Sequence, residues 1–183
     1  VKAKEIHIIT NHEAFDLIAR LLKSSGRNFT SKEYTRLVPL EYANKPIKGI
    51  KPKTVFITFS RLNALIQKND LEEMGFKTSV LYGNLPPEIK KRQIQRFIDG
   101  EVDVVVSTDC IGQGLNLPCD EICFTAYEKF DGVVNRPLTS IEIKQIAGRA
   151  GRFGFSEKGT VTAVNKNMLR NLKGQLDKKI PLT

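Results

Sequence analysis

Short apolar runs alternate with segments of helical periodicity from Lys53 onward, and this alternation limits the possible folds more than any other feature. The run at residues 102–107 is dominated by valine, which is typical of a strand buried on both faces. Regular alternation of strands and helices favours an α/β fold, a parallel sheet with helices on both faces. The predicted strands are residues 55–59, 79–82, 102–107, 122–126 and 159–164, and the predicted helices are residues 62–74, 86–98, 140–150 and 168–176.

The first part of the chain differs from this pattern. Residues 5–10 predict a strand and residues 13–23 a helix, whereas residues 24–27 and 44–52 have the composition of linkers. We expect residues 1–52 to be a lead-in and linker and residues 53–183 to be one domain, since 183 residues suffice for both. The chain opens at Val1 without a signal peptide, which indicates an excised fragment, and no apolar run approaches the roughly 20 residues of a membrane helix.

The formal net charge of +9 favours a polyanionic partner. Nucleic acid is the first candidate, because phosphate contacts by lysine and arginine supply most non-specific affinity. An acidic membrane surface is a weaker candidate, since the basic residues are spread along the chain without an amphipathic basic helix. Cys110, Cys119 and Cys123 lack zinc-site spacing, so they predict buried free thiols in a reducing compartment and no metal site.

Residues 145–152, Gln-Ile-Ala-Gly-Arg-Ala-Gly-Arg, carry the most specific chemical pattern. On a helix, the spacing of Gln145, Arg149 and Arg152 would place all three polar heads on one face. Gly148 and Gly151 would let a ligand or another surface approach the backbone closely. A pair of arginines held in this way suits the bidentate grip of a triphosphate. The alternative interpretation is a basic helix end on a solvated surface.

Polar residues follow three of the predicted strands. Functional groups on a parallel sheet gather beyond the carboxyl ends of its strands. These ends carry Ser60 and Arg61 after the first strand, Gly83 after the second and Thr108 after the third. Together they predict one polar edge along which a phosphate backbone could lie, although turn chemistry would also explain Gly83.

Three segments resemble the signature motifs of superfamily 2 helicases in their second RecA-like motor domain. Residues 55–61 resemble motif IV, residues 104–118 resemble motif V and residues 145–152 resemble motif VI. Their order and spacing agree with those of the helicases over roughly residues 53 to 164.

Further runs are similar to the RNA helicase family of the mitochondrial degradosome and its bacterial relatives. They are residues 82–87, 111–117, 131–132 with 136–139, and 145–154. Residues 5–7 and 35–40 also have counterparts there, just ahead of the second motor domain. The resemblance therefore implies that residues 5–10 derive from the tail of the first motor domain.

This resemblance implies a role for each candidate residue. Arg152 would be the arginine finger on the γ-phosphate of ATP, with Arg149 and Gln145 in the same polar cluster. Gly114 and Asn116 match positions near the nucleotide sugar. Ser60, Arg61, Gly83 and Thr108 match positions that hold the phosphates of single-stranded RNA.

The resemblance also implies partners. ATP would lie between this domain and the first RecA-like domain of the same protein, and that missing domain would hold Mg²⁺. No membrane partner is expected. The protein would be cytoplasmic in a bacterium and mitochondrial in a eukaryote.

The chain departs from a complete helicase in two ways. No segment reads Gly-x-x-x-x-Gly-Lys-Ser/Thr, so the phosphate-binding loop of a first motor domain is absent and the chain alone should be inactive. Asp120 and Glu121 imitate a metal-holding carboxylate pair, but they precede the strand at residues 122–126 and are predicted to be a strand lead-in.

Other classes of function remain as alternatives. One is a superfamily 2 DNA helicase or translocase, and another is a stand-alone nucleic-acid-binding module. A dinucleotide-dependent enzyme on a Rossmann sheet is disfavoured, because no Gly-x-Gly-x-x-Gly follows a predicted strand.

Overall fold

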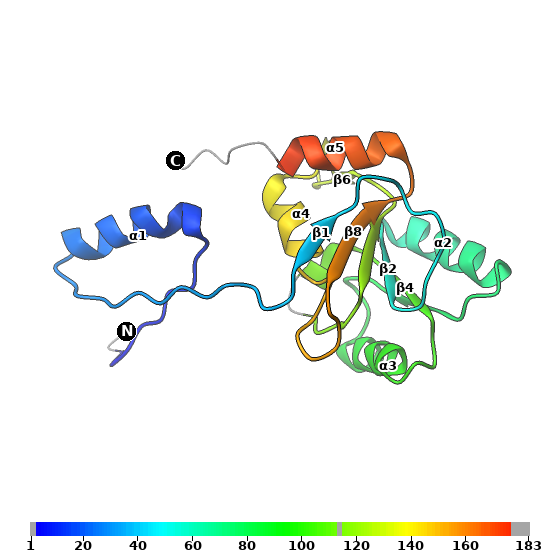
Figure 1. Cartoon of the computed structure of the whole chain (residues 1–183), viewed down its shortest axis with the longest axis horizontal. Coiled ribbons are helices and arrows are strands. Elements are labelled where there is room, and N and C mark those ends of the chain that lie inside the picture. Colours follow the sequence, from blue (N-terminus) through cyan, green and yellow to red (C-terminus); the bar gives the residue numbers. More distant parts are fainter. Residues whose placement is uncertain (1–2, 113–114, 177–183) are drawn as a thin grey trace. The chain divides into compact units, whose positions relative to one another are not determined.

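The computed structural model describes residues 3–112 and 115–176, which form two compact units separated just before Arg36 (Figure 1). The first unit contains helix α1 (His12–Ser24), which begins where Asn11 Oδ1 accepts a hydrogen bond from the Ala14 amide at 2.9 Å. The predicted helix at residues 13–23 is thus confirmed. The predicted strand at residues 5–10 is wrong, because a strand needs a neighbouring backbone to pair with and these residues have none within the described parts of the chain.

The second unit is built on a six-stranded sheet in the order β1-β8-β5-β2-β4-β3. Every neighbouring pair in it is parallel. The predicted α/β fold with a parallel sheet is therefore confirmed. Its strands are β1 (Leu40–Tyr42), β2 (Thr54–Ile57), β3 (Thr78–Leu81), β4 (Val104–Ser107), β5 (Glu121–Phe124) and β8 (Gly159–Ala163).

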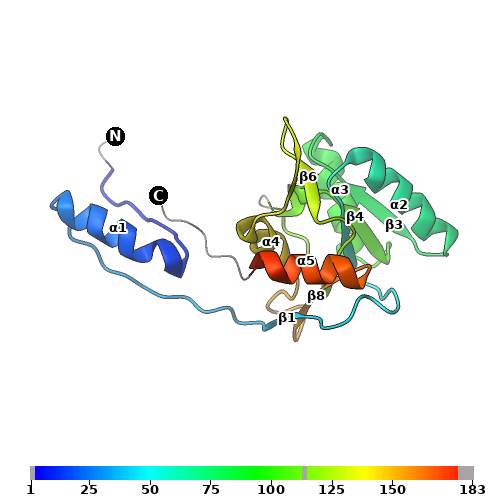
Figure 2. The same cartoon turned by 90° about the horizontal axis from the view of Figure 1, so that it is seen from above.

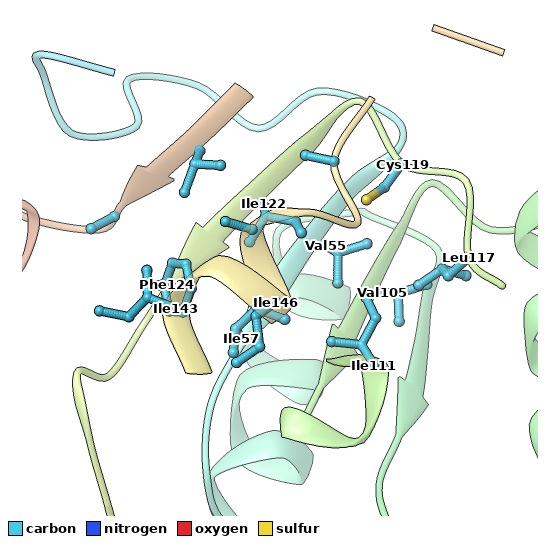
Figure 3. Packing of buried hydrophobic residues seen from close by; sticks show 14 of the residues in the cluster. Val55, Ile57, Val105, Ile111, Leu117, Cys119, Ile122, Phe124, Ile143 and Ile146 are labelled. Carbon is cyan, nitrogen blue, oxygen red and sulfur yellow. The ribbon is translucent and has the colours of Figure 1, made fainter. Parts of the chain in front are cut away.

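Helices cover both faces of this sheet, and the alternation of side chains along each strand decides which core a residue joins. In β2, Val55 and Ile57 belong to the larger core, whereas Phe56 belongs to the smaller core on the opposite face. The larger core packs under α3, α4 and α5, and Figure 3 shows its centre; the smaller core packs under α2. The helices are α2 (Arg61–Glu73), α3 (Pro87–Ile98), α4 (Ser140–Ala147) and α5 (Lys166–Leu176).

The sheet also recruits chain from the segment predicted as lead-in and linker. Strand β1 pairs with β8 and forms one edge of the sheet. Ile47 and Ile50, which follow it, pack against the smaller core. The strand signal at β1 is weak because the strand is only three residues long and contains the exposed Glu41.

A short antiparallel hairpin, β6 (Glu128–Phe130) with β7 (Asn135–Pro137), lies between β5 and α4 in sequence, and the sequence analysis did not predict it. Figure 2 shows this hairpin projecting from the domain. A turn of 3₁₀ helix, η1 (Asp109–Gly112), follows β4. Among the residues that the structure describes, no helix is long and apolar enough to cross a membrane.

Candidate functional site

The carboxyl ends of three adjacent strands, β2, β4 and β3, bring the predicted polar edge together. Ser60 caps α2, where its hydroxyl accepts a hydrogen bond from the Asn63 amide at 3.0 Å. Thr108 is only 7% exposed, and its amide donates to the Leu81 carbonyl at 3.0 Å. Ser60 and Arg61 are exposed, so this edge offers a hydroxyl and a cation to solvent.

Arg61 joins the ends of two of these strands. Its guanidinium lies over the Tyr82 ring, 5.1 Å from the ring centroid, so the cation is held by an aromatic face rather than by a carboxylate. Gly83, the next residue, is exposed, and its carbonyl accepts a hydrogen bond from Lys90 Nζ at 2.5 Å. The structure thus brings Arg61, Gly83 and two further residues, Tyr82 and Lys90, to one basic corner. The sequence analysis did not assign Lys90, because its contact depends on how α3 packs beside β3.

The helical arrangement predicted for Gln145, Arg149 and Arg152 is wrong. Helix α4 ends at Ala147, with Gly148 as its C-cap, so only Gln145 lies on the helix. Arg149 and Arg152 follow in a loop of tight turns, where the amides of residues 149 and 150 donate to carbonyls three residues back. The helix cannot continue because Ala150 forms a parallel bridge with Cys119 and Gly151 takes a left-handed φ of +69°.

The loop at residues 148–152 is held down by a close backbone approach. A Cβ added to Gly151 would lie 2.4 Å from the Gly159 amide nitrogen, well inside contact distance. The Gly151 amide also donates to the Cys119 carbonyl at 2.8 Å. Glycine is therefore required at residue 151 for both its φ angle and its contact with β8.

Tertiary packing nevertheless brings Gln145 and Arg149 together beside η1. Arg149 Nη2 donates to the Gly112 carbonyl at 2.9 Å. A Cβ placed on Gly112 would lie 3.8 Å from Gln145 Cβ, which is ordinary van der Waals contact, so η1 packs directly beside Gln145. The segments that resemble motifs V and VI therefore contact each other here.

Arg149 and Arg152 line a surface pocket of about 360 Å³ together with Asn116. The Arg152 guanidinium lies 5.6 Å from the centroid of the Phe155 ring, which is a cation–π contact. Gly114, the other residue predicted to be near the sugar, lies outside the described residues. Gln145 does not line this pocket.

Arg36 forms another wall of the pocket, and the sequence analysis did not assign it. Its guanidinium donates to the carbonyls of Val38 at 2.6 Å, Gly148 at 2.9 Å and Gly151 at 2.7 Å, and also to that of Ala150. No spacing rule connects residue 36 with residues 148–151. The only sequence signal was the resemblance of residues 35–40 to their helicase counterparts.

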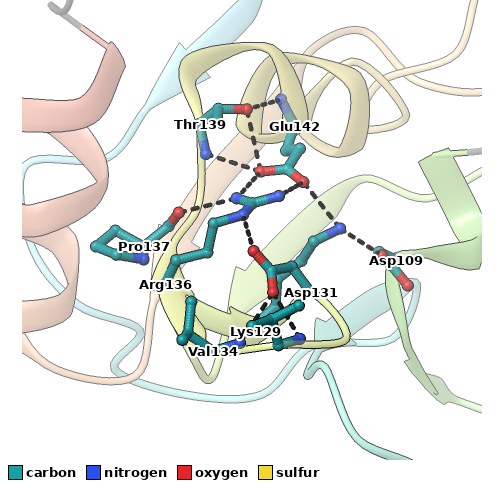
Figure 4. Close-up of polar contacts among 9 residues, drawn as sticks. Asp109, Lys129, Asp131, Val134, Arg136, Pro137, Thr139 and Glu142 are labelled. Carbon is teal, nitrogen blue, oxygen red and sulfur yellow. Dashed lines mark hydrogen bonds and ion pairs between the residues drawn. The ribbon is translucent and has the colours of Figure 1, made fainter.

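An ion-pair network ties the hairpin to the start of α4, and Figure 4 shows it. Glu142 accepts two hydrogen bonds from Arg136 at 2.9 Å and lies 2.8 Å from Lys129, which also pairs with Asp109 at 3.1 Å. Glu142 completes a capping box with Thr139 as well. The Arg136 hydrogen bonds hold the pKa of Glu142 well below its usual range.

This network was also missed as a unit, although part of it could have been found. The run Thr139-Ser140-Ile141-Glu142 has the spacing of a capping box, which marks a helix start from sequence alone.

Asp120 and Glu121 lie at the amino end of β5, as predicted for a strand lead-in. Glu121 contacts Thr54 at 3.4 Å, and burial raises the pKa of its carboxyl group. The three cysteines are free and buried, as predicted, and burial raises the pKa of Cys119 to about 12. Among the described residues, no group of three or more histidine, cysteine or acidic side chains could hold a metal ion.

Comparison with known families identifies the domain to which this site belongs. Residues 41–154 match the family described as "Helicase conserved C-terminal domain". The chain belongs to this family of helicase C-terminal domains.

Curated relatives of this helicase domain are much longer than the chain. They include "ATP-dependent RNA helicase SUV3, mitochondrial" of Oryza sativa subsp. japonica, 41% identical over 97% of this chain and 32% of that protein. The Saccharomyces paradoxus protein of the same name is 35% identical over 98% of this chain and 26% of its own length. "DExH-box ATP-dependent RNA helicase DExH16, mitochondrial" of Arabidopsis thaliana is 38% identical over 100% of this chain and 33% of its own length. The chain thus spans about a quarter to a third of these relatives.

Solved structures confirm the RecA-like fold of the helicase domain. The C-terminal domain of the DEAD-box protein Dbp5 superposes with a TM-score of 0.58, at 16% identity over 76% of this chain and 83% of that chain. The Escherichia coli DEAD-box protein SrmB superposes with a TM-score of 0.56, at 20% identity over 78% of this chain and 85% of that chain. The predicted resemblance to the second RecA-like motor domain of a helicase is therefore confirmed. At 16% and 20% identity, the two solved structures support the fold and nothing more specific.

Proposed function

We propose that the chain is the second motor domain of an ATP-dependent RNA helicase, and that it supplies the arginine finger and half of the RNA-binding track. The observation that carries this proposal is the pocket lined by Asn116, Arg149 and Arg152, which lies in the loops following β4 and α4. The mitochondrial relatives are described as ATP-dependent RNA helicases, which supports RNA as the substrate and ATP as the nucleotide.

The donors in this pocket fit a nucleoside triphosphate. An amide at Asn116 can bond the hydroxyl groups of a ribose, and two guanidinium groups suit the charge of a polyphosphate. Arg152 is the residue we assign as the arginine finger, because it lines the pocket, matches the last arginine of motif VI and is held by a cation–π contact with Phe155. A guanidinium in this role stabilises the charge that develops on the phosphoryl oxygens during transfer.

Arg149 and Gln145 support this pocket from the side of η1. Arg149 Nη2 donates a hydrogen bond to the Gly112 carbonyl at 2.9 Å, and this bond holds its guanidinium next to the segment that resembles motif V. Gln145, exposed beside Gly112, remains available to a bound nucleotide or to the first motor domain. We assign Gly114 and Asn116 to the sugar side on the basis of the motif resemblance.

The RNA track would follow the carboxyl ends of β2, β4 and β3. Ser60 and Arg61 present a hydroxyl and a cation there, and Gly83 leaves open space above its Cα. Such contacts to phosphate carry no base information, so binding would be largely independent of RNA sequence. Thr108, although mostly buried, would contact the strand through its hydroxyl.

The catalytic unit would be completed by the first RecA-like domain of the same protein. No carboxylate lines the pocket among the described residues, so the residues present do not fit Mg²⁺, which the first domain would hold. We place residues 1–52 as the lead-in from that domain and residues 53–183 as the second motor domain, with residues 36–52 of the lead-in packing onto this domain as its edge strand β1 and the segment after it. The relatives' names favour a mitochondrial protein if the source is a eukaryote, and by resemblance a bacterial protein would be cytoplasmic.

The Arg152→Ala variant of the full-length helicase tests this assignment. A residue that acts mainly in the transition state should lower RNA-stimulated turnover by roughly 10³-fold or more while ATP binding changes little. Arg152→Lys should restore little, because a point charge cannot copy the planar fork.

The result also separates the alternatives. A change confined to KM would make Arg152 an ordinary binding residue. RNA affinity that does not respond to ATP would favour a stand-alone binding module, and stimulation by DNA alone would favour a DNA translocase.

A further inference from the structure

Arg36 makes the most concentrated set of backbone contacts around the candidate site. Its guanidinium donates to the Val38 carbonyl on its own segment and to the carbonyls of Gly148, Ala150 and Gly151 on the loop after α4. The two segments lie 112 to 115 residues apart in sequence. The arginine therefore fastens the start of the compact unit to the loop at residues 148–152.

Electrostatics explains why an arginine holds this place. Gly148 is the C-cap of α4, at the negative end of the helix dipole, and the carbonyls of Ala150 and Gly151 follow close behind it. Their oxygens would repel one another where the loop folds back beside Gly159. A planar guanidinium can donate to several carbonyls at fixed angles at once. A lysine ammonium is a compact point charge and cannot reproduce this arrangement of donors.

The loop that Arg36 holds is the one that carries Arg149 and Arg152. Arg36, Asn116 and both of these arginines line the same pocket. A guanidinium that fixes the carbonyls of Gly148, Ala150 and Gly151 also fixes the backbone from which Arg149 and Arg152 project. Without it, this backbone would keep the β-bridge between Ala150 and Cys119, the Gly151 amide bond to the Cys119 carbonyl and the two hydrogen bonds of Arg149, but it would lose the group that bonds three of its carbonyls at once.

We propose that Arg36 is a positioning residue: it sets the geometry of the loop at residues 148–152, and through it the placement of the arginine finger. This proposal rests on the proposed function, since it assigns Arg36 to the same nucleotide-facing pocket. Arg36 also belongs to the chain that enters the domain, so it couples that entering segment to the finger.

Turnover measurements on the full-length helicase provide the first test. We expect Arg36→Ala to lower kcat by roughly 10²-fold, the effect of misplacing a catalytic group by about 1 Å, with little change in ATP affinity. Arg36→Lys should be nearly as low, because the fork is lost although the charge stays. Arg96→Ala is the matched control: it removes an arginine that pairs with Glu101 on the surface of α3, and kcat should stay normal.

A double variant separates positioning from loss of stability. If Arg36 acts through Arg152, adding Arg36→Ala to Arg152→Ala should lower kcat no further. A merely structural arginine would lower turnover in both backgrounds by the same factor, and that result would overturn the proposal. Normal kcat in Arg36→Ala beside a low kcat in Arg152→Ala would overturn it as well, while leaving the proposed function intact.

Hydrogen exchange gives a readout that does not depend on activity. Arg36→Ala should speed exchange of the amides at residues 149–151 at least tenfold, while the amides of β2 and β4 keep their wild-type rates. Equal acceleration throughout the domain, or none at residues 149–151, would contradict positioning. If Arg152→Ala proves fully active, the proposed function fails, and this exchange pattern still decides whether Arg36 holds the loop.

Discussion

Gly151 shows how one residue shapes the candidate nucleotide pocket. Its φ of +69° favours glycine, and its Cα packs against the backbone of Gly159 where no side chain fits. The loop packs this closely against the start of β8 because both residues, Gly151 and Gly159, lack a side chain. The packing of the backbone at Gly151 therefore sets the direction in which the side chain of the next residue, Arg152, projects.

Gly151→Ala should destabilise the domain strongly. The left-handed φ costs an alanine about 1–2 kcal/mol, and the clash of its Cβ with backbone adds about 1–3 kcal/mol. Gly154→Ala is the matched control, because Gly154 also has a positive φ, +83°, but no heavy atom within 4 Å of an added Cβ. Urea unfolding should show a clearly larger loss for Gly151→Ala, and equal losses would mean that the clash relaxes freely.

The basic corner at Arg61 makes a second prediction at the residue scale. Arg61→Ala should weaken binding of single-stranded RNA by a similar factor for unrelated sequences, and it should make the salt slope shallower by about 0.7 for one lost phosphate contact. Thr108→Val should weaken binding with almost no change in slope, because a hydroxyl releases no counterion. Isotherms at three or more salt concentrations on two unrelated oligonucleotides check both, and unchanged isotherms would remove these residues from the track.

At the scale of elements, the ion-pair network makes the β6–β7 hairpin and α4 one unit. The Glu142 carboxylate pairs with Arg136 and Lys129, one from each strand of the hairpin. It also caps its own helix by accepting a hydrogen bond from the Thr139 amide. Lys129 also reaches Asp109 in η1 at 3.1 Å. Glu142 thereby joins the hairpin to α4, and Lys129 extends the network to η1 through a second carboxylate, that of Asp109.

The depressed pKa of Glu142 predicts a stability change in acid. Because the folded-state pKa lies below the unfolded value of about 4.3, Glu142 contributes stability above that pH, and the contribution is lost as the pH falls toward the folded-state pKa. Glu142→Gln should cost about 1–3 kcal/mol at pH 7 and less as the pH drops below about 4, since the unfolded wild-type chain then takes up a proton that the folded chain does not.

In melting curves recorded from pH 7 to pH 3, the difference in Tm between wild type and variant should become smaller as the pH falls. Glu73→Gln, at an exposed carboxylate that ends α2, serves as the control and should give no such gap. A gap that stays constant with pH would mean that Glu142 acts through packing rather than charge.

At the scale of the whole molecule, the domain carries the polar edge and the pocket lined by Arg149 and Arg152, but no phosphate-binding loop in its sequence. We expect the isolated chain to show no ATPase activity. Joining it to the first motor domain should restore RNA-stimulated turnover, because the finger then meets a bound triphosphate. A phosphate-release assay on the chain, with and without RNA, checks this, and RNA-dependent turnover by a rigorously pure chain would contradict it.

Local sequence patterns suffice to predict the parallel sheet and all of its strands except β1. Strands β2, β4 and β5 are short runs of mostly buried apolar residues, so their local pattern predicts them. Parallel pairing follows from the helices that connect the strands. The polar edge could be predicted for the same reason, since carboxyl ends of parallel strands meet. The candidate residues on it follow those strands directly in sequence.

Tertiary structure alone decided where the arginines of residues 145–152 lie. Helical spacing predicted one face, but the bridge from Ala150 to Cys119 and the contact of Gly151 with Gly159 end the helix at Ala147. These contacts join residues far apart in the chain, and no local propensity encodes them. The hydrogen bonds of Arg36 and the three-residue strand β1 could not be predicted for the same physical reason. Each is stabilised by partners more than a hundred residues away in the chain.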